Sequence, residues 1–226
     1  MVPFDIQQTG NPRHTREIGP ADGLTLQRSA LLCLIPQTPI LFVGQEWNAS
    51  TPFQFFADHN QKLGQSINDG RRREFDKFVA SSDRLISLTI PDPQDEKTFA
   101  NSKLRWEELK DPQHAQILRL YREFLVLRQT QRGSGVLSRE DYSVLELDDG
   151  IVAILFGSAA EYNFAVLTDL VGGHDQRALD DKRIAPGLGR DWKSILSSNE
   201  KRFGGTNDPP FTVRTTLVLA ARGMRF

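Results

Sequence analysis

Residues 38–60 read TPILFVGQEWNASTPFQFFADHN. The five apolar residues 39–43 precede Gly44, a pattern typical of a β-strand that is buried on both faces, as in a parallel sheet. A glutamate, a tryptophan and a loop rich in phenylalanine follow. Barrel enzymes line sugar pockets with an acid and aromatic rings at the carboxyl end of such a strand. The alternative is a strand that enters a well-packed loop.

Outward from this stretch, hydrophobic spacing predicts two helices. Residues 24–35 are apolar on most faces, which predicts a buried helix that Pro36 ends. Residues 112–131 carry apolar side chains at spacings of three and four, with Asp111 as the N-cap and Pro112 at the first helical position. A helix followed by a strand indicates α/β architecture.

A long polar excursion, residues 49–106, lies between these elements. Its phenylalanines and Trp106 favour an ordered segment that folds back on the domain, and it is predicted to contain only short helical pieces such as 71–79. We expect Arg71, Arg72 and Arg73 to form a solvated helix face, with at most one of them reaching a pocket.

After Gly133 and Gly135 the spacing becomes that of β-strands. Residues 148–150, Asp-Asp-Gly, give a hairpin signal. The predicted domains are an irregular segment 1–23, an α/β part 24–133 with the aromatic-rich loop, and an antiparallel all-β domain 134–226, with the boundary near 133–138. The predicted strands are 142–147, 151–156, 162–168 and 211–219.

Composition restricts the class of partner. The net charge is -1, with 28 basic and 29 acidic residues, so no global field attracts nucleic acid or an anionic membrane. The single cysteine, Cys33, excludes an intramolecular disulfide and is expected to be a small buried hydrophobe in a reducing compartment. No stretch approaches the roughly 20 apolar residues of a membrane span, and residues 1–23 are unlike a secretory signal, so we expect a cytoplasmic protein.

Four motifs in a fixed order indicate a family. They are PQTPILFVGQEWNASTPFQFFADHN (36–60), GRRREF (70–75), IPDPQDEKTFANSKLRW (90–106) and LYREFLVLR (120–128). Together they resemble the C-terminal portion of the maltooligosyltrehalose trehalohydrolases, glycoside hydrolases of the alpha-amylase family, over nearly the whole chain. WKSILSSNEKRFGG (192–205) also resembles the C-terminal β-domain of that family.

The resemblance implies a fold and a reaction. It implies the end of a (β/α)8 barrel, with 39–43 as the eighth strand and 112–131 as the last helix, followed by a small antiparallel β-sandwich. The family releases trehalose from maltooligosyl trehalose by cleaving the adjacent α-1,4 bond. Its aspartate nucleophile and glutamate acid/base come from the fourth and fifth barrel strands, which this sequence does not contain, so the resemblance assigns no catalytic residue here. Residues 6–11, IQQTGN, match a third family motif only in part: Gln7 stands where that motif has its aspartate, and Asp5 fits only after a shift in register.

The candidate substrate-binding residues are Glu46, Trp47, Asp58 and His59. Glu46 is either an acceptor for sugar hydroxyls or an anchor for neighbouring backbone and arginine groups, and Trp47 either stacks on a pyranose or, the favoured alternative, fills the core. Asp58 and His59 either contact a sugar or form a capped loop turn with a solvent-facing histidine. In the β-domain, Trp192, Phe203 and Phe211 are expected to fill the core rather than to form a sugar-stacking platform.

No metal or other cofactor is predicted, because the histidines and acidic groups show no ligand spacing.

Three functions remain open. In the first, the chain is part of a trehalohydrolase and is inactive alone, because the missing barrel strands lie on a second chain or have been lost. In the second, it is a non-catalytic module that binds maltooligosaccharide. In the third, it is a remnant that depends on a partner and exposes apolar surface.

Overall fold

The computed structural model describes residues 23–79, 91–148, 150–158, 161–171, 179–186, 190–207 and 216–221. Contacts divide the chain into two compact units. The excursion unit contains residues 1–19 and 49–108, and the sheet unit contains residues 20–48 and 109–226. Almost all of the predicted irregular segment 1–23 lies outside the described residues, as do Asp5, Gln7 and Phe211.

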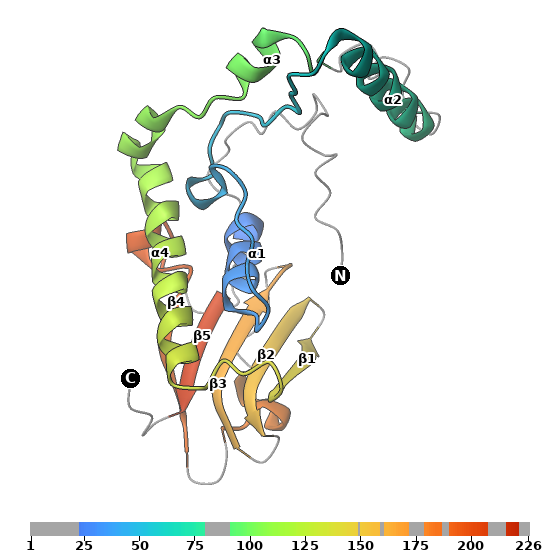
Figure 1. Ribbon diagram of the computed structural model, residues 1–226. Coiled ribbons are helices and arrows are strands. Elements are labelled where there is room, and N and C mark those ends of the chain that lie inside the picture. Colours follow the sequence, from blue (N-terminus) through green and yellow to red (C-terminus); the bar gives the residue numbers. More distant parts are fainter. Residues whose placement is uncertain are drawn as a thin grey trace. The chain divides into compact units, whose positions relative to one another are not determined.

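The sheet unit is built on one five-stranded sheet (Figure 1). The strand order is β1-β2-β3-β5-β4, and every neighbouring pair is antiparallel. The antiparallel sheet predicted from residues 142–147, 151–156 and 162–168 is therefore confirmed. The bounds are β1 Tyr142–Asp148, β2 Ile151–Ser158, β3 Glu161–Asp169, β4 Trp192–Ser197 and β5 Thr216–Ala221. The sequence did not predict β4, and β5 falls partly within the predicted strand 211–219.

The β1–β2 hairpin turns where the Asp-Asp-Gly signal predicted it. Asp148 pairs with Ile151, and Gly150 adopts φ 87. A Cβ atom at Gly150 would lie 2.4 Å from Cγ2 of Val171, so the turn requires glycine for both its backbone conformation and its packing.

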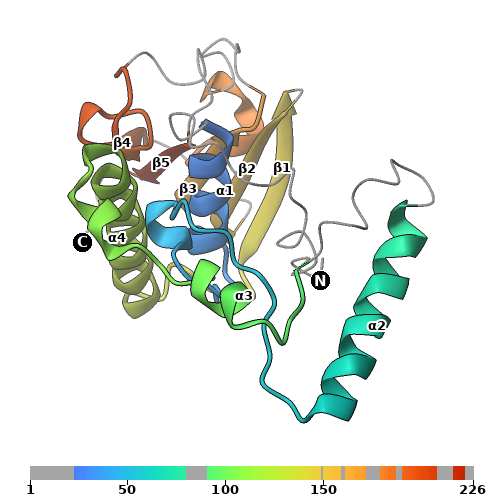
Figure 2. The same cartoon turned by 90° about the horizontal axis from the view of Figure 1, so that it is seen from above.

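One face of the sheet packs against two helices, α1 (Gly23–Leu34) and α4 (Pro112–Gly133). α1 contacts α4, β3 and β5 (Figure 2). Burying each large apolar side chain of this core contributes about 1.5–3 kcal/mol. The core includes Cys33, Leu34, Ile117, Leu120, Tyr121, Phe124, Phe156, Phe164, Val166 and Val218.

Both predicted helices are confirmed. α1 ends at Leu34, two residues before Pro36. α4 begins at Pro112, and the Asp111 side chain accepts a hydrogen bond of 2.8 Å from the Gln113 backbone N–H, as an N-cap does.

The opposite face of the sheet carries a second core. A segment that contains the short 3-10 helix η7 (Lys182–Ile184) covers it, and Ile184 is fully buried. In the described part of the chain the sheet therefore packs against helices and an irregular segment, and the second sheet of the predicted sandwich is not found there. The buried residues of this face are Ile151, Ala153, Leu155, Tyr162, Ala165, Leu167, Ile184, Leu217 and Leu219.

The predicted strand 39–43 is wrong. These residues form no ladder, and Ile40 and Val43 are 82% and 54% exposed. Of these five residues, only Leu41 packs against the core that the sheet forms with α1 and α4. A strand needs a neighbouring strand to accept and donate its backbone hydrogen bonds, and the described residues offer none here. The chain turns instead, because Gln45 N–H donates to the carbonyl of Phe42 at 2.9 Å and starts the 3-10 helix η3 (Gln45–Trp47).

The excursion unit contains α2 (Gln61–Val79) and α3 (Glu96–Asn101). α2 is longer than the predicted 71–79 because Asn60 Oδ1 accepts from Leu63 N–H at 3.1 Å and caps an earlier start. Arg72 and Arg73 are exposed, as expected, whereas the Arg71 guanidinium lies 4.5 Å from the ring centroid of Phe55.

Candidate functional site

The FADHN loop, residues 56–60, is joined to the PDPQD segment, residues 91–95, within the excursion unit. The Ala57 N–H donates to the carbonyl of Pro93 at 2.9 Å, and the His59 N–H donates to Gln94 Oε1 at 3.1 Å. Two of the motifs that carry the family resemblance are thus in direct contact, 35 residues apart in sequence.

Gly64 allows α2 to approach this contact. A Cβ atom at Gly64 would lie 2.8 Å from Cδ of Gln94, the side chain that holds the His59 N–H. Any larger residue at position 64 would therefore push Gln94 away from the loop.

The carboxylates of the PDPQD segment are structural. Asp92 Oδ1 accepts from the Gln94 N–H at 2.9 Å, and Asp92 Oδ2 accepts from Asn68 Nδ2 at 2.8 Å. Asp95 is the N-cap of α3 and accepts from the Lys97 N–H at 2.9 Å. Both acids shape the turn and the helix start, so they hold the segment in place against the loop.

A hollow of about 600 Å³ lies between the two segments. Two aromatic rings line it, Phe56 and Phe99, with centroids 5.0 Å apart and an edge-to-face arrangement. Both rings are partly exposed, at 37% and 43%. The remaining lining residues are Ala57, Asp58, Pro93, Gln94, Asp95 and Glu96.

Of the two candidate residues in this loop, Asp58 lines the hollow and is exposed. His59 is exposed too, and it is held through its backbone N–H. Glu96, which sequence reasoning did not single out, supplies a second carboxylate to the hollow. The sequence held one signal for Glu96. Asp95 is a good N-cap, so it predicts a helix start that places Glu96 in the first turn, next to the FADHN-contacting segment.

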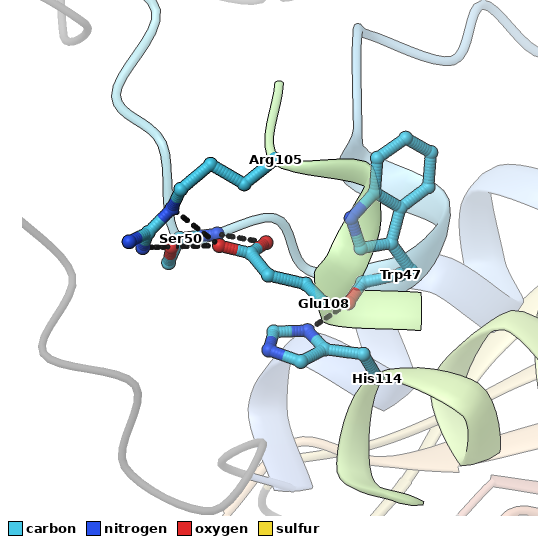
Figure 3. Close-up of polar contacts among 5 residues, drawn as sticks. All are labelled: Trp47, Ser50, Arg105, Glu108 and His114. Atoms are coloured by element: carbon cyan, nitrogen blue, oxygen red, sulfur yellow. Dashed lines mark hydrogen bonds and ion pairs between the residues drawn. The ribbon is translucent and has the colours of Figure 1, made fainter. Parts of the chain in front are cut away.

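A cluster of three side chains closes the base of the excursion unit (Figure 3). Glu108 Oε2 accepts from the Ser50 N–H at 3.1 Å, and Arg105 Nε donates to Glu108 Oε1 at 3.0 Å. The Ser50 hydroxyl also contacts both Glu108 and Arg105. Glu108 is only 12% exposed, so this charge-assisted cluster holds residue 50, at the start of the aromatic loop, against residues 105–108.

The other two candidates, Glu46 and Trp47, lie on η3 in the sheet unit. Trp47 is 2% exposed, and its carbonyl accepts a hydrogen bond of 2.7 Å from Nδ1 of His114 (Figure 3). A carbonyl can only accept, so Nδ1 of His114 carries a proton. The favoured alternative, that Trp47 fills the core, is the arrangement observed, and its indole is not available for stacking in this unit.

Glu46 is partly buried and lies near the phenol of Tyr121. Burial raises the pKa of Tyr121, while its hydrogen bonds with Ser29, at 2.6 Å, and Gln45 act in the opposite direction. The negative charge of Glu46 adds to the increase in the pKa. This network joins η3 to α1 and α4 and places Glu46 beside a structural core of the sheet unit.

No helix among the described residues is long and apolar enough to cross a membrane. In the same part of the chain, no group of three or more histidine, cysteine, aspartate or glutamate residues is arranged to hold a metal ion.

Comparison with a solved structure gives the class of fold. A Salmonella typhimurium protein assigned by its name to the alpha amylases superimposes with a TM-score of 0.61 and 25% identity, over 88% of this chain and 30% of that one. The described sheet is consistent with the C-terminal domain of alpha-amylase family enzymes, and no barrel is shown by the described residues. No protein-family model matches the chain.

The curated relatives are more specific. A Malto-oligosyltrehalose trehalohydrolase of Deinococcus radiodurans is 49% identical over 124 residues, which is 54% of this chain and 20% of the relative. The enzyme of the same name from Rhizobium sp. is 41% identical over 127 residues, or 55% of this chain and 20% of the relative. The chain therefore spans about a fifth of the length of these relatives, and the resemblance to the maltooligosyltrehalose trehalohydrolases holds over part of its length.

Proposed function

We propose that this chain is the C-terminal part of a maltooligosyltrehalose trehalohydrolase and forms one wall of its glucan-binding site. The observation that supports this is the hollow between the FADHN and PDPQD segments. It combines the carboxylates of Asp58 and Glu96, which accept hydrogen bonds from sugar hydroxyls, with the partly exposed rings of Phe56 and Phe99, which offer apolar surface to a pyranose. His59 remains a candidate for a further contact with this glucan, and Glu46 stays a separate candidate in the sheet unit.

Cleavage requires groups that the resemblance does not assign to this chain. A retaining glycosidase needs two carboxyl groups about 5–5.5 Å apart across the sugar, one as nucleophile and one as acid/base. The family draws them from other barrel strands, and the two aspartates beside the hollow, Asp92 and Asp95, are committed to turn and helix capping. We therefore expect the chain to bind glucan and not to cleave it.

Two measurements test these statements. Purified chain incubated with maltooligosyl trehalose is expected to release no trehalose, and clear turnover would contradict the inactivity. Calorimetric titration with maltoheptaose is expected to give saturable heat. Substituting Asp58→Ala is expected to weaken binding about tenfold, because a hydrogen bond to a charged group is lost.

A matched control is Asp69→Ala, an exposed aspartate on α2 that does not line the hollow. It is expected to leave the affinity unchanged. If no heat is released at millimolar maltoheptaose, the chain is not a glucan-binding wall by itself.

A second function, a module that depends on a partner, is favoured by the segment 39–43. Ile40 and Val43 are 82% and 54% exposed, and such apolar surface is typical of a contact with another chain or chain part. We propose that the missing part of the enzyme covers these side chains. Replacing both residues by serine is expected to lower the binding of a hydrophobic dye, and Val126→Ser, an equally exposed site on α4, is the control. A wild-type monomer that binds no dye would contradict this function.

A further inference from the structure

A second hollow, of about 960 Å³, lies in the sheet unit over β4 and β5. Its floor includes Leu217 and Leu219 of β5, each 3% exposed. Both belong to the core on the sheet face opposite α1 and α4. The hollow thus opens on the face of the sheet that η7 covers in part, and none of its lining residues belongs to the excursion unit.

The register of the edge pair explains why this surface is hollowed. Across the ladder, Leu219 pairs with Ser194 and Leu217 pairs with Ser197. Two small polar side chains therefore stand where large ones would close the sheet face. Leu217 and Leu219 lie at the bottom of the hollow and stay buried, so the indole of Trp192 supplies its accessible apolar surface.

Trp192, the first residue of β4, forms an aromatic wall of this hollow. Its Nε1–H donates to the carbonyl of Ile184 at 2.8 Å, and its ring packs partly against the second core. A ring that is held in one orientation before a ligand arrives loses little conformational entropy on binding.

The rim is polar and almost neutral. Three of its charged groups are in ion pairs: Asp181 with Arg183 at 2.7 Å, Glu200 with Arg202 at 2.8 Å, and Arg190 with Glu161 at 2.6 Å. The remaining charged lining groups are those of Lys182, Asp180 and Asp191. The amides of Asn199 and Asn207 complete the rim.

These features select for one ligand chemistry. The indole of Trp192 favours a ring with an apolar face, while carboxylates and amides favour several hydroxyl groups on the same ligand. Phosphates and other anions are disfavoured by the exposed Asp180 and Asp191. We propose that this hollow is a second carbohydrate-binding site, which holds a neutral glucan chain by contact with Trp192.

The site is independent of the glucan-binding wall on the excursion unit. Its test is therefore a signal that belongs to Trp192 alone. In the nitrogen-15 spectrum of the whole chain, the indole N–H signal of Trp192 is assigned by its loss in Trp192→Phe. We expect this signal to shift in a saturable manner with maltoheptaose, in wild type and equally in Asp58→Ala.

Three variants define the outcome. Trp192→Ala lacks the indole signal, so its maltoheptaose affinity is measured by calorimetry in the Asp58→Ala background; it is expected to fall about tenfold, since the aromatic contact is lost. Asn207→Gly removes an amide from the rim and keeps the left-handed backbone at φ 66, so it tests the site without disturbing the core. It is expected to weaken binding several-fold. Lys193→Ala, an exposed neighbour on β4 that does not line the hollow, is expected to change nothing.

An indole signal of Trp192 that does not move at millimolar maltoheptaose would overturn the proposal. So would a titration of that signal that is the same in Asn207→Gly as in the wild type. A lost Trp192 response in Asp58→Ala would show that the effect comes from the other hollow, and would also overturn it. Weaker binding by calorimetry in Asp58→Ala with the Trp192 response retained supports two separate sites.

Discussion

At the scale of single residues, Arg128 determines how α1 ends. Its guanidinium donates to the carbonyls of Cys33 at 2.9 Å, Ile35 at 2.5 Å and Gln37 at 2.7 Å. Carbonyls at a helix C-terminus have no partner within the helix and carry partial negative charge, so a buried cation both satisfies and neutralises them. Arg128 thereby fixes the direction in which residues 38–43 leave the helix.

Replacing Arg128 by leucine should therefore destabilise the protein. The apolar packing would remain, but several carbonyls would lose their donor, and we expect the free energy of unfolding to fall by about 2–4 kcal/mol. Urea denaturation followed by circular dichroism measures this. Arg132→Leu, an exposed residue one turn further along α4, should change the free energy of unfolding by less than about 0.5 kcal/mol. Equal effects of the two substitutions would contradict the role assigned to Arg128.

Cys33 makes stability depend on alkaline pH. Burial raises the pKa of its thiol from the usual 9.0 to about 12, although nearby Arg128 lowers it. Between these values the folded chain keeps a proton that the unfolded chain releases, so the free energy of unfolding falls as the pH rises from 9.0 towards about 12. Burial also raises the pKa of Tyr121, so this residue is expected to lower the free energy of unfolding in the same direction as the pH rises.

We expect Cys33→Ala to make this alkaline decline shallower without removing it. Urea midpoints measured at several pH values from neutral to strongly alkaline give the comparison. A decline of the same steepness in the wild type and in the variant would show that the thiol does not contribute.

At the scale of elements, the contact between Ser50 and Glu108 supports the aromatic loop. The bond spans 58 residues, so it closes the whole excursion at its base. Glu108 is only 12% exposed and accepts hydrogen bonds from the Ser50 N–H and from Arg105. Removing the Glu108 carboxylate therefore removes both of these charge-assisted hydrogen bonds.

Glu108→Ala is accordingly expected to free the start of the loop. Amide hydrogen exchange of Ser50 should accelerate at least tenfold, since its N–H loses an acceptor worth about 1.5–3 kcal/mol. Glu107→Ala, the exposed neighbour on the 3-10 helix η5 (Trp106–Lys110), is the matched control and should leave that amide unchanged. An unaltered Ser50 exchange rate in Glu108→Ala would contradict the supporting role of this contact.

At the scale of the whole molecule, the excursion unit is an insertion within the sheet unit. Residues 20–48 and 109–226 both belong to the sheet unit, and the bond between His114 and the Trp47 carbonyl joins the two sides of the insertion point. All five strands and both sheet-packing helices lie outside residues 49–108.

A chain in which a short glycine-serine linker replaces residues 49–108 should therefore retain the sheet. We expect strand-rich circular dichroism and one cooperative thermal transition, because the two cores of the sheet unit draw no residue from the excursion. The same linker in place of residues 142–148, which removes β1, is the control and should reduce cooperativity. Non-cooperative melting of the first variant would show that the sheet unit depends on the excursion.

Local features of the sequence were sufficient for the elements that depend on nearby residues. The helix α4 with its Asp111 cap, the end of α1 before Pro36 and the hairpin at Gly150 all follow from spacings and turn chemistry within a few residues. β4 was missed because its sequence, WKSILS, has only three large apolar residues and no clear alternation. In the site, Asp58 lines the hollow, and its contact with a sugar stays a prediction.

The sequence by itself determined the strands β1, β2 and β3, the helices α1 and α4 and the resemblance to the trehalohydrolases, because periodicity, caps and motifs are local in the chain. Only the tertiary structure decided that residues 39–43 are not a strand, since a ladder depends on a partner strand. It also decided that Arg128 caps α1, that the FADHN loop meets the PDPQD segment and that Trp192 lines a second hollow. Each of these depends on contacts between segments far apart in sequence, which periodicity does not encode.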